Sequence, residues 1–329
     1  MAGIGVRLNK IFGRNTLTTN MIGFFYSTLV TVAPMFAIII NLVLMEYFLK
    51  FSTLGYAQRE LFSCTILYTF IFSLLTASPF NAVLSRYISD VIYEERYQDI
   101  LPCYHIGMML NIVLSCLVGI PFCLWEHFVG GVSVAYVFAG FWCYISLVFV
   151  FYSMIYLSIC KDYQRIAQYY IVGMLVAFFL SLFLRYICHW GITQSMLAAM
   201  DAGFFLTAVL ENALVKRYFR KNSNRYKPVL SYFKMYWQLV VTNFLYILGL
   251  YVHNFVFWTT DMRMVVLDSF VCNQPYDMAS CLAMFTNISA TIIFIARVEM
   301  YFHEKYKLYS EAVIGGRGAD IQNAKKRMF

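Results

Sequence analysis

The sequence predicts an all-α protein that crosses a membrane several times. Of its 329 residues, 61% are hydrophobic and 13% are charged, whereas a soluble domain has about 45–50% apolar and about 25% charged residues. The apolar residues also gather in runs of about 20, the length that an α-helix needs to cross a bilayer. The 31 Phe and 26 Tyr exclude a disordered chain, because disorder requires low hydrophobicity and few aromatic residues.

Apolar runs define eight candidate spans. They cover roughly residues 21–48, 61–85, 101–125, 132–159, 166–188, 192–215, 235–258 and 278–297. An even number of spans puts both termini on one side of the membrane, and the positive-inside rule identifies that side as the cytoplasm. Only four of the 25 basic residues would then lie in outer loops: Lys50, Arg59, Arg185 and Arg263. The net charge of +8 therefore reflects topology, and we expect no nucleic-acid partner.

The same order of features occurs twice along the chain. The second span begins near Phe62-Ser63-Cys64 and leads into an acidic, Tyr-rich segment, and the eighth begins near Ala279-Ser280-Cys281 and leads into a similar segment. Such repeats indicate two related lobes. We predict three regions: an N-terminal amphipathic helix and a six-helix lobe at 1–215, a basic cytoplasmic linker at 216–234, and the first two helices of a second lobe with a cytoplasmic amphipathic helix at 235–329. On this division the second lobe is incomplete, and we expect the chain to be truncated.

Asp201 is the residue that the sequence most strongly links to transport. It lies about eight residues, or about 12 Å, into span 192–215, near the middle of a hydrocarbon core about 30 Å thick. A carboxylate at that depth costs about 2.5–3.5 kcal/mol and usually faces a bundle interior or a hydrated cavity. We expect Asp201 to line the transport path; the alternative is a structural carboxyl group bonded to a neighbouring helix. Glu211 lies near the end of the same span, where a side chain can reach the interface.

Intramembrane amides and prolines form a second set of candidates. Four amides could bond sugar hydroxyl groups along a transport path, although bonds between helices are their commoner use: Asn81, Asn111, Asn243 and Asn287. Pro34 and Pro79 lie near the middles of the first two spans, where each removes a backbone hydrogen bond. They are candidates for kinks in moving helices, and a static kink that improves packing is the alternative.

No pattern in the sequence predicts an enzyme, a metal site or a cofactor site. The nine Cys are scattered without a CxxC pair or a Cys/His cluster, which predicts buried free thiols. The sequence also lacks HExxH, GxSxG and a glycine-rich phosphate loop. His105 and His253 together with Asp201 would suggest an intramembrane acyltransferase, but the two His lie near opposite ends of their spans. Acyl transfer is the alternative from a different functional class.

Several short motifs resemble the PelG family, and together they span the whole chain. They are Met1 to Gly5 followed by Leu8 and Lys10, the run Ser85 to Asp90 leading to Ile100-Leu101-Pro102, and Arg297-Val298-Glu299 leading through Tyr306, Tyr309 and Ala312 to Gly315-Gly316 and residues 321–328. PelG proteins are inner-membrane transporters for Pel exopolysaccharide, within the multidrug/oligosaccharidyl-lipid/polysaccharide exporter superfamily.

The resemblance implies two six-helix lobes that face each other across a central path with alternating access. It also implies a location in the bacterial inner membrane and a hexosamine-rich polysaccharide substrate for the biofilm matrix. The implied partners, besides membrane lipids, are a cytoplasmic glycosyltransferase and other inner-membrane Pel components. An exporter of lipid-linked oligosaccharides or small molecules from the same superfamily is the alternative.

Overall fold

The computed structural model describes residues 17–160, 162–280, 282–283, 286, 303–315 and 317–328. Nearly all of this part of the chain is helical. The α-helices are α2 (Leu17–Phe48), α3 (Tyr56–Ala77), α4 (Asn81–Tyr93), α5 (Ile100–Phe128), α6 (Val134–Ile159), α7 (Tyr163–Tyr186), α8 (Ile192–Tyr218), α9 (Lys227–Met235), α10 (Trp237–Trp258), α12 (His303–Gly315) and α13 (Gly318–Met328). Short 3-10 turns cover Phe51–Thr53 and Tyr97–Asp99, and two strands, β1 (Met264–Val266) and β2 (Phe270–Cys272), form a hairpin.

Six of the described helices are long and apolar enough to cross a membrane: α3, α5 with its preceding turn, α6, α7, α8 and α10. The stretch Val32–Phe48 of α2 is a shorter apolar helix. The predicted class, an all-α polytopic membrane protein, is therefore confirmed. The predicted span 278–297 lies mostly outside the described residues, as does the predicted N-terminal amphipathic helix, so the total of eight spans stays a prediction.

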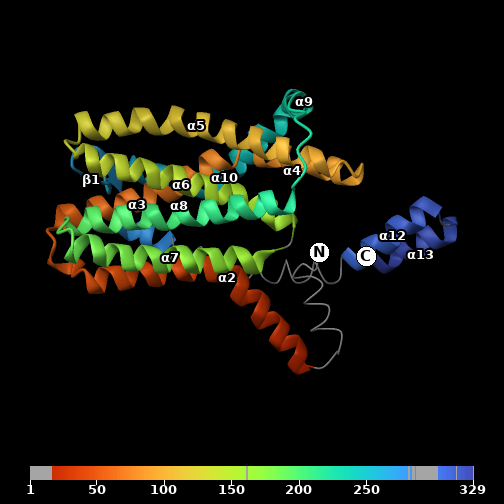
Figure 1. Ribbon diagram of the computed structural model, residues 1–329, viewed down its shortest axis with the longest axis horizontal. Coiled ribbons are helices and arrows are strands. Elements are labelled where there is room, and N and C mark those ends of the chain that lie inside the picture. Colours follow the sequence, from red (N-terminus) through yellow and green to blue (C-terminus); the bar gives the residue numbers. More distant parts are fainter. Residues whose placement is uncertain are drawn as a thin grey trace.

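The long helices lie side by side in one bundle (Figure 1). α8 packs against both α6 and α7, α2 packs against α7, and α3 and α5 pack against α6. Buried tyrosines pair with one another inside the bundle. The Tyr152 hydroxyl donates to the Tyr104 carbonyl oxygen at 2.8 Å, and the Tyr104 hydroxyl lies 2.9 Å from the Ser153 hydroxyl. These bonds satisfy polar groups that neither lipid nor water can reach.

Facing glycines let α7 and α8 approach closely. A Cβ atom at Gly173 would lie 2.6 Å from the carbonyl oxygen of Gly203, and a Cβ atom at Gly203 would lie 2.7 Å from that of Gly173. Any larger side chain would therefore force the two backbones apart. Small residues at such positions are typical of packed membrane helices, because contact between the backbones supplies the van der Waals attraction.

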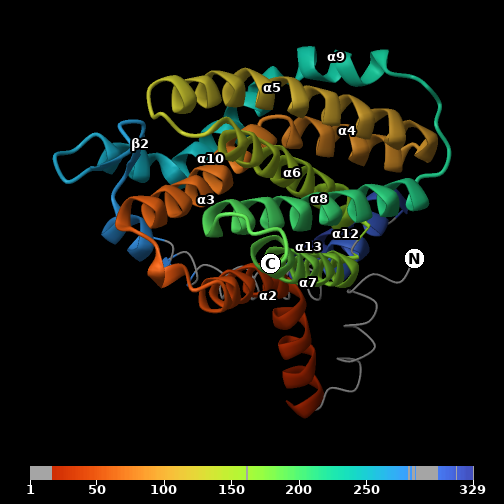
Figure 2. The ribbon, with the colours of Figure 1, turned by 60° about the vertical axis from the view of Figure 1, so that its left-hand side comes forward.

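The predicted second span is not one continuous helix. α3 ends at Ala77 and α4 begins at Asn81, with Ser78, Pro79 and Phe80 between them. Proline lacks the N–H that would continue the helical ladder, and its ring clashes with the carbonyl group four residues earlier. The predicted acidic, Tyr-rich extension is α4, and it ends at Tyr93. The other proline candidate, Pro34, lies inside α2, whose ribbon bends sharply (Figure 2).

The predicted linker region 216–234 contains a short amphipathic helix. α8 continues to Tyr218, and α9 begins at Lys227 with Pro228 in its first turn, a position where the missing N–H is harmless. α9 packs on α4: Val229 is buried, the Tyr232 ring meets the Tyr87 ring edge-on at 4.9 Å, and the Tyr232 hydroxyl donates to Asp90 at 3.1 Å. Burial in this contact raises the pKa of Tyr87 to about 12.

The hairpin was not predicted, because the sequence indicated only an outer loop between the spans 235–258 and 278–297. β1 and β2 are antiparallel, with Met264 opposite Cys272 and Val266 opposite Phe270. Leu267 and Asp268 adopt positive φ angles of 50° and 56° in the turn, as primed hairpin turns require. Strands of three residues are too short to show the alternation of apolar and polar residues by which a strand is normally recognised.

α10 is the least covered of the long helices. Of its side chains only Asn254 and Trp258 are buried. It contacts α3, α4, α9 and β2, and a row of apolar side chains on the rest of its surface is exposed, including Val241, Leu245, Leu250, Val252 and Val256.

Candidate functional site

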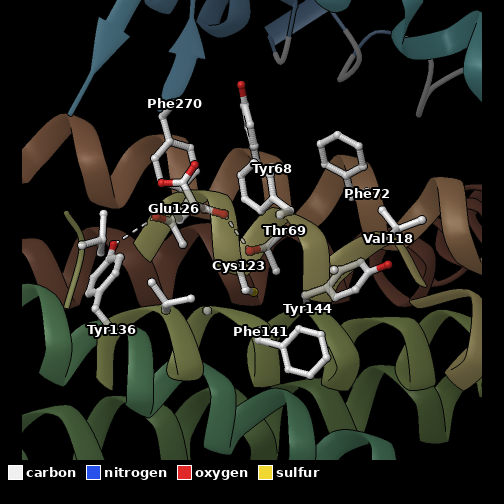
Figure 3. Close-up of a pocket in the computed structure, with 16 residues that line it drawn as sticks. Tyr68, Thr69, Phe72, Val118, Cys123, Glu126, Tyr136, Phe141, Tyr144 and Phe270 are labelled. Carbon is white, nitrogen blue, oxygen red and sulfur yellow. Dashed lines mark hydrogen bonds between the residues drawn. The ribbon is translucent and has the colours of Figure 1, made fainter. Parts of the chain in front are cut away.

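The described residues line a partly open cavity of about 240 Å³ between α3, α5 and α6, under the hairpin (Figure 3). Its lining is almost entirely apolar and aromatic: Thr65, Tyr68, Thr69, Phe72, Val118, Gly119, Phe122, Cys123, Glu126, Val132, Tyr136, Val137, Gly140, Phe141, Tyr144 and Phe270. The volume suits a group the size of one sugar ring or a short acyl segment, and it is small for a hydrated polymer.

Glu126 supplies the charged group of this cavity. Its side chain is 3% exposed, and one carboxylate oxygen, Oε2, accepts a hydrogen bond from the Ser269 hydroxyl at 2.7 Å. The other oxygen, Oε1, has no hydrogen-bond partner among the described residues. A buried acceptor without a partner is costly, so this oxygen is the natural contact for a hydroxyl or amine donor on a ligand. Glu126 is not among the residues predicted from the sequence, although it is the single acidic residue in the apolar run 106–129.

Most of the remaining polar groups of the cavity are already paired. The Tyr136 hydroxyl donates to the Thr65 hydroxyl at 3.1 Å, and the Tyr144 hydroxyl donates to that of Thr76 at the same distance. The Thr65 hydroxyl in turn donates to the Leu61 carbonyl oxygen at 2.7 Å. These bonds hold α6 against α3 and leave aromatic faces as the main surface that a ligand would meet.

Tyr68 joins the hairpin to the bundle. Its hydroxyl donates to the Val271 carbonyl oxygen at 2.5 Å and accepts from the Val271 N–H at 3.2 Å. Its ring stacks on Trp258 with 4.7 Å between centroids and meets Phe270 edge-on at 5.2 Å. The hairpin is therefore a fixed roof over the cavity, held by backbone and side-chain contacts to α3 and α10.

Asp201 lies away from this cavity, on α8 where it packs against α6. It is half-buried, and its Oδ1 atom accepts a hydrogen bond from the Ser146 hydroxyl at 3.0 Å. The hydrogen bond to α6 agrees with a structural role for Asp201. The partial exposure of its side chain agrees with a role in the transport path. The two interpretations of Asp201 both stay open.

The break between α3 and α4 brings three of the predicted residues together. The Ser78 carbonyl oxygen accepts hydrogen bonds from the backbone N–H of Asn81, at 3.1 Å, and from the side-chain amide of Asn243 on α10. Pro79 lies between Ser78 and Asn81. The carbonyl that the missing N–H of Pro79 leaves unpaired is that of Leu75, and it accepts a hydrogen bond from the Ser78 hydroxyl at 3.2 Å. The Ser78 carbonyl oxygen at the break is satisfied in part by another helix, as membrane burial demands.

The other amides do not join this group. Asn111 is fully buried and donates to the carbonyl oxygen of Gly107 on its own helix at 2.8 Å. Asn287 lies outside the described residues. The predicted candidates therefore occupy at least three separate places: the α3–α4 break, the contact of α8 with α6, and the interior of α5.

Glu211 differs most from its prediction. We expected Glu211 to lie near the end of its span and to reach the interface. Instead α8 continues beyond Glu211 to Tyr218, and the Glu211 side chain is 0% exposed. Neither carboxyl oxygen has a hydrogen-bond partner among the described residues.

The residues that would suggest an acyltransferase do not lie together, because His105 lies at the start of α5, whereas His253 meets Tyr276 close to the hairpin. Among the residues that the structure describes, no group of three or more His, Cys, Asp or Glu side chains is placed to hold a metal ion.

Comparison with known families identifies the chain. The family model for PelG, described as "Putative exopolysaccharide Exporter (EPS-E)", matches residues 1–329. Comparison with curated proteins and with solved structures gave no significant match. A match over the whole chain agrees with the motifs at its two ends and in α4, and with a bundle of apolar helices that contains a ligand-sized cavity. The chain belongs to the PelG family of exopolysaccharide exporters.

Proposed function

We propose that the chain moves a Pel-type, hexosamine-rich exopolysaccharide across the bacterial inner membrane for deposition in a biofilm matrix. The observation that carries this proposal is the family match over residues 1–329. The protein acts as a transporter rather than an enzyme, and its partners are the glycosyltransferase that makes the polymer and other inner-membrane components of the same machinery.

The proposed path runs between two lobes. Helices α2 to α8 form the first lobe, and α10 begins the second. The exposed apolar row of α10 supports this division, because such a surface fits further helices of the same lobe. Asp201 and the amides of the α3–α4 break are the proposed polar contacts of the polymer, and the break itself is the proposed hinge between the lobes.

The proposed orientation follows the basic residues. The end of the bundle that carries α4, α9 and the segment 219–226 faces the cytoplasm and its glycosyltransferase, and the end that carries the hairpin faces outward. A second function, export of a lipid-linked oligosaccharide, is favoured by one feature. The cavity beside Glu126 is apolar and of sugar-ring or acyl size, which suits a lipid-linked unit better than a hydrated polymer.

Export in a complete Pel system tests the proposal. Deleting the gene is expected to abolish labelled hexosamine polymer outside the cell while the glycosyltransferase stays active in membranes, and the full-length gene should restore secretion. Normal secretion of a polymer with altered acylation would instead identify an acyltransferase. Accumulation of a lipid-linked oligosaccharide on the inner leaflet, with polymer secretion intact, would identify the second function.

A further inference from the structure

The hairpin and α3 meet in matched register. Glu60, Cys64 and Tyr68 are spaced four residues apart on one face of α3, a rise of about 6 Å per step. Phe270 and Cys272 point to the same side of β2, with a step of about 6.6 Å, and Gln274 follows two residues later. The outer pairs are in contact: Gln274 donates to Glu60 at 3.1 Å, and the Phe270 and Tyr68 rings lie 5.2 Å apart.

The middle pair of this register is Cys64 and Cys272. Each residue is 2% exposed, and both are free thiols in the structure. The contacts on either side of them place Cys64 opposite Cys272. The neighbouring Val271 is held through both its N–H and its carbonyl group by the Tyr68 hydroxyl. The chain on both sides of the pair is therefore anchored, which keeps Cys272 opposite Cys64.

We propose that Cys64 and Cys272 form a disulfide bond that fixes the hairpin to α3 on the outer side of the membrane. The inference rests on the proposed orientation, because disulfides persist on the oxidising side and are reduced in the cytoplasm. The bond joins segments 208 positions apart and holds the roof closed over the cavity beside Glu126.

The chemistry is thiol–disulfide exchange with a protein oxidant that carries a reactive disulfide on that side of the membrane. The Cys272 thiolate attacks one sulfur of the oxidant and forms a mixed disulfide, which releases one oxidant thiolate. The Cys64 thiolate then attacks the Cys272 sulfur and releases the second oxidant thiolate. One S–S bond forms and one breaks, and the oxidant accepts two electrons and the two thiol protons.

Two other cysteines provide internal controls. Cys188 is exposed in the turn between α7 and α8, at the end of the bundle that carries the hairpin. Cys160 is partly buried at the end of α6, on the opposite end. Neither has a cysteine neighbour in the described part of the chain comparable to the Cys64–Cys272 pair, so both are expected to be free thiols.

Differential alkylation of the full-length protein in native membranes tests the bond. Membranes are denatured in N-ethylmaleimide without reductant, then reduced and treated with iodoacetamide, and the peptides are analysed by mass spectrometry. We expect the iodoacetamide label on Cys64 and Cys272 and the maleimide label on Cys188 and Cys160. In Cys64→Ser, Cys272 should change to the maleimide label. Maleimide on both Cys64 and Cys272 of the unmodified protein, or a Cys272–Cys281 bond, would overturn the proposal.

An impermeant maleimide applied to intact cells separates this proposal from the orientation on which it rests. Labelling of Cys188 but not Cys160 supports the proposed orientation, and free Cys64 and Cys272 in the same cells would then refute the disulfide alone. Labelling of Cys160 with protection of Cys188 would refute the orientation, and the disulfide with it. Neither the differential alkylation nor the maleimide labelling depends on whether the protein exports polymer.

Discussion

Asp201 presents the clearest choice between a structural and a functional role at the scale of a single residue. Its hydrogen bond from the Ser146 hydroxyl ties α8 to α6, and its side chain is only partly buried. A charged hydrogen bond is worth about 1.5–3 kcal/mol. Because 1.4 kcal/mol corresponds to a factor of ten in rate, the two roles predict export rates that differ measurably.

If Asp201 lines the path, Asp201→Asn should leave the amount of membrane protein nearly unchanged and reduce export by about tenfold or more, since it keeps the shape but removes the charge. The measurement is secreted polymer per unit of full-length protein in the membrane. Ser146→Ala is the matched control, because it removes the partner and leaves the carboxyl group. Wild-type export from Asp201→Asn, together with low abundance of Asp201→Leu, would establish the structural role.

The contact between α7 and α8 shows how small residues position a whole element. Gly173 and Gly203 place their backbones so close that a Cβ atom at either site overlaps a carbonyl oxygen of the other. The same faces carry Thr207, whose hydroxyl donates to the Gly203 carbonyl oxygen at 2.9 Å. α8 also carries Asp201 and Glu211, so the depth and rotation of these carboxyl groups depend on this contact.

Gly203→Ala should therefore destabilise the bundle by about 1–3 kcal/mol, the usual effect of overpacking. The expected result is a midpoint of thermal unfolding in detergent that is several degrees lower, with less protein in the membrane. Gly249→Ala on α10 is the control, because no atom of another described element lies within 4 Å of its added Cβ. Equal midpoints for the two variants would show that α7 and α8 are less tightly packed than described.

The segment between α8 and α9 contains exposed basic residues, which predict where a protease will cut the chain. Arg220, Lys221 and Arg225 are exposed outside any helix, whereas Lys227 precedes Pro228 and Lys234 lies within α9. Trypsin in detergent should cut at the first three sites and leave a stable fragment that contains α2 to α8. Cleavage at Lys234 before these sites, or a fully resistant chain, would contradict a separate N-terminal lobe. Mass spectrometry of the fragments identifies the cut.

At the scale of the whole molecule, the turns alternate between the two ends of the bundle (Figure 1). The turns before α3, between α5 and α6, and between α7 and α8 share one end with the hairpin, and the segment between α8 and α9 lies at the other. This alternation is what the predicted spans require. Six long apolar helices in the described part of the chain confirm a multi-pass membrane protein, and the positive-inside rule supplies the expected orientation.

Single cysteines introduced into a Cys188→Ser background test that orientation in intact cells. Gly55→Cys and Asp268→Cys should react with an impermeant maleimide, because they lie in turns at the hairpin end. Ser223→Cys should react only after the membrane is opened, because the positive-inside rule puts its segment in the cytoplasm. The readout is the labelled fraction of each protein by gel shift. Reaction of Ser223→Cys in intact cells would reverse the topology.

The sequence by itself determined the class of the protein and the positions of its long helices. The predicted spans 132–159 and 192–215 correspond to Val134–Ile159 and Ile192–Tyr218, because the length of an apolar run and the charges that flank it are local properties of the chain. The family resemblance, confirmed over residues 1–329, likewise depended on short motifs that can be read along the sequence.

Only the tertiary structure decided what the polar groups contact. The bond from Gln274 to Glu60, the bond from Asn243 to the Ser78 carbonyl oxygen, and the approach of Ser269 to Glu126 each join residues more than 140 positions apart. The burial of Glu211 likewise depended on how far α8 extends and which face it turns inward. Such contacts form because each buried donor or acceptor needs a hydrogen-bond partner, and packing decides which helix or hairpin supplies it. The sequence of either segment alone does not determine which residues of the other segment it will contact.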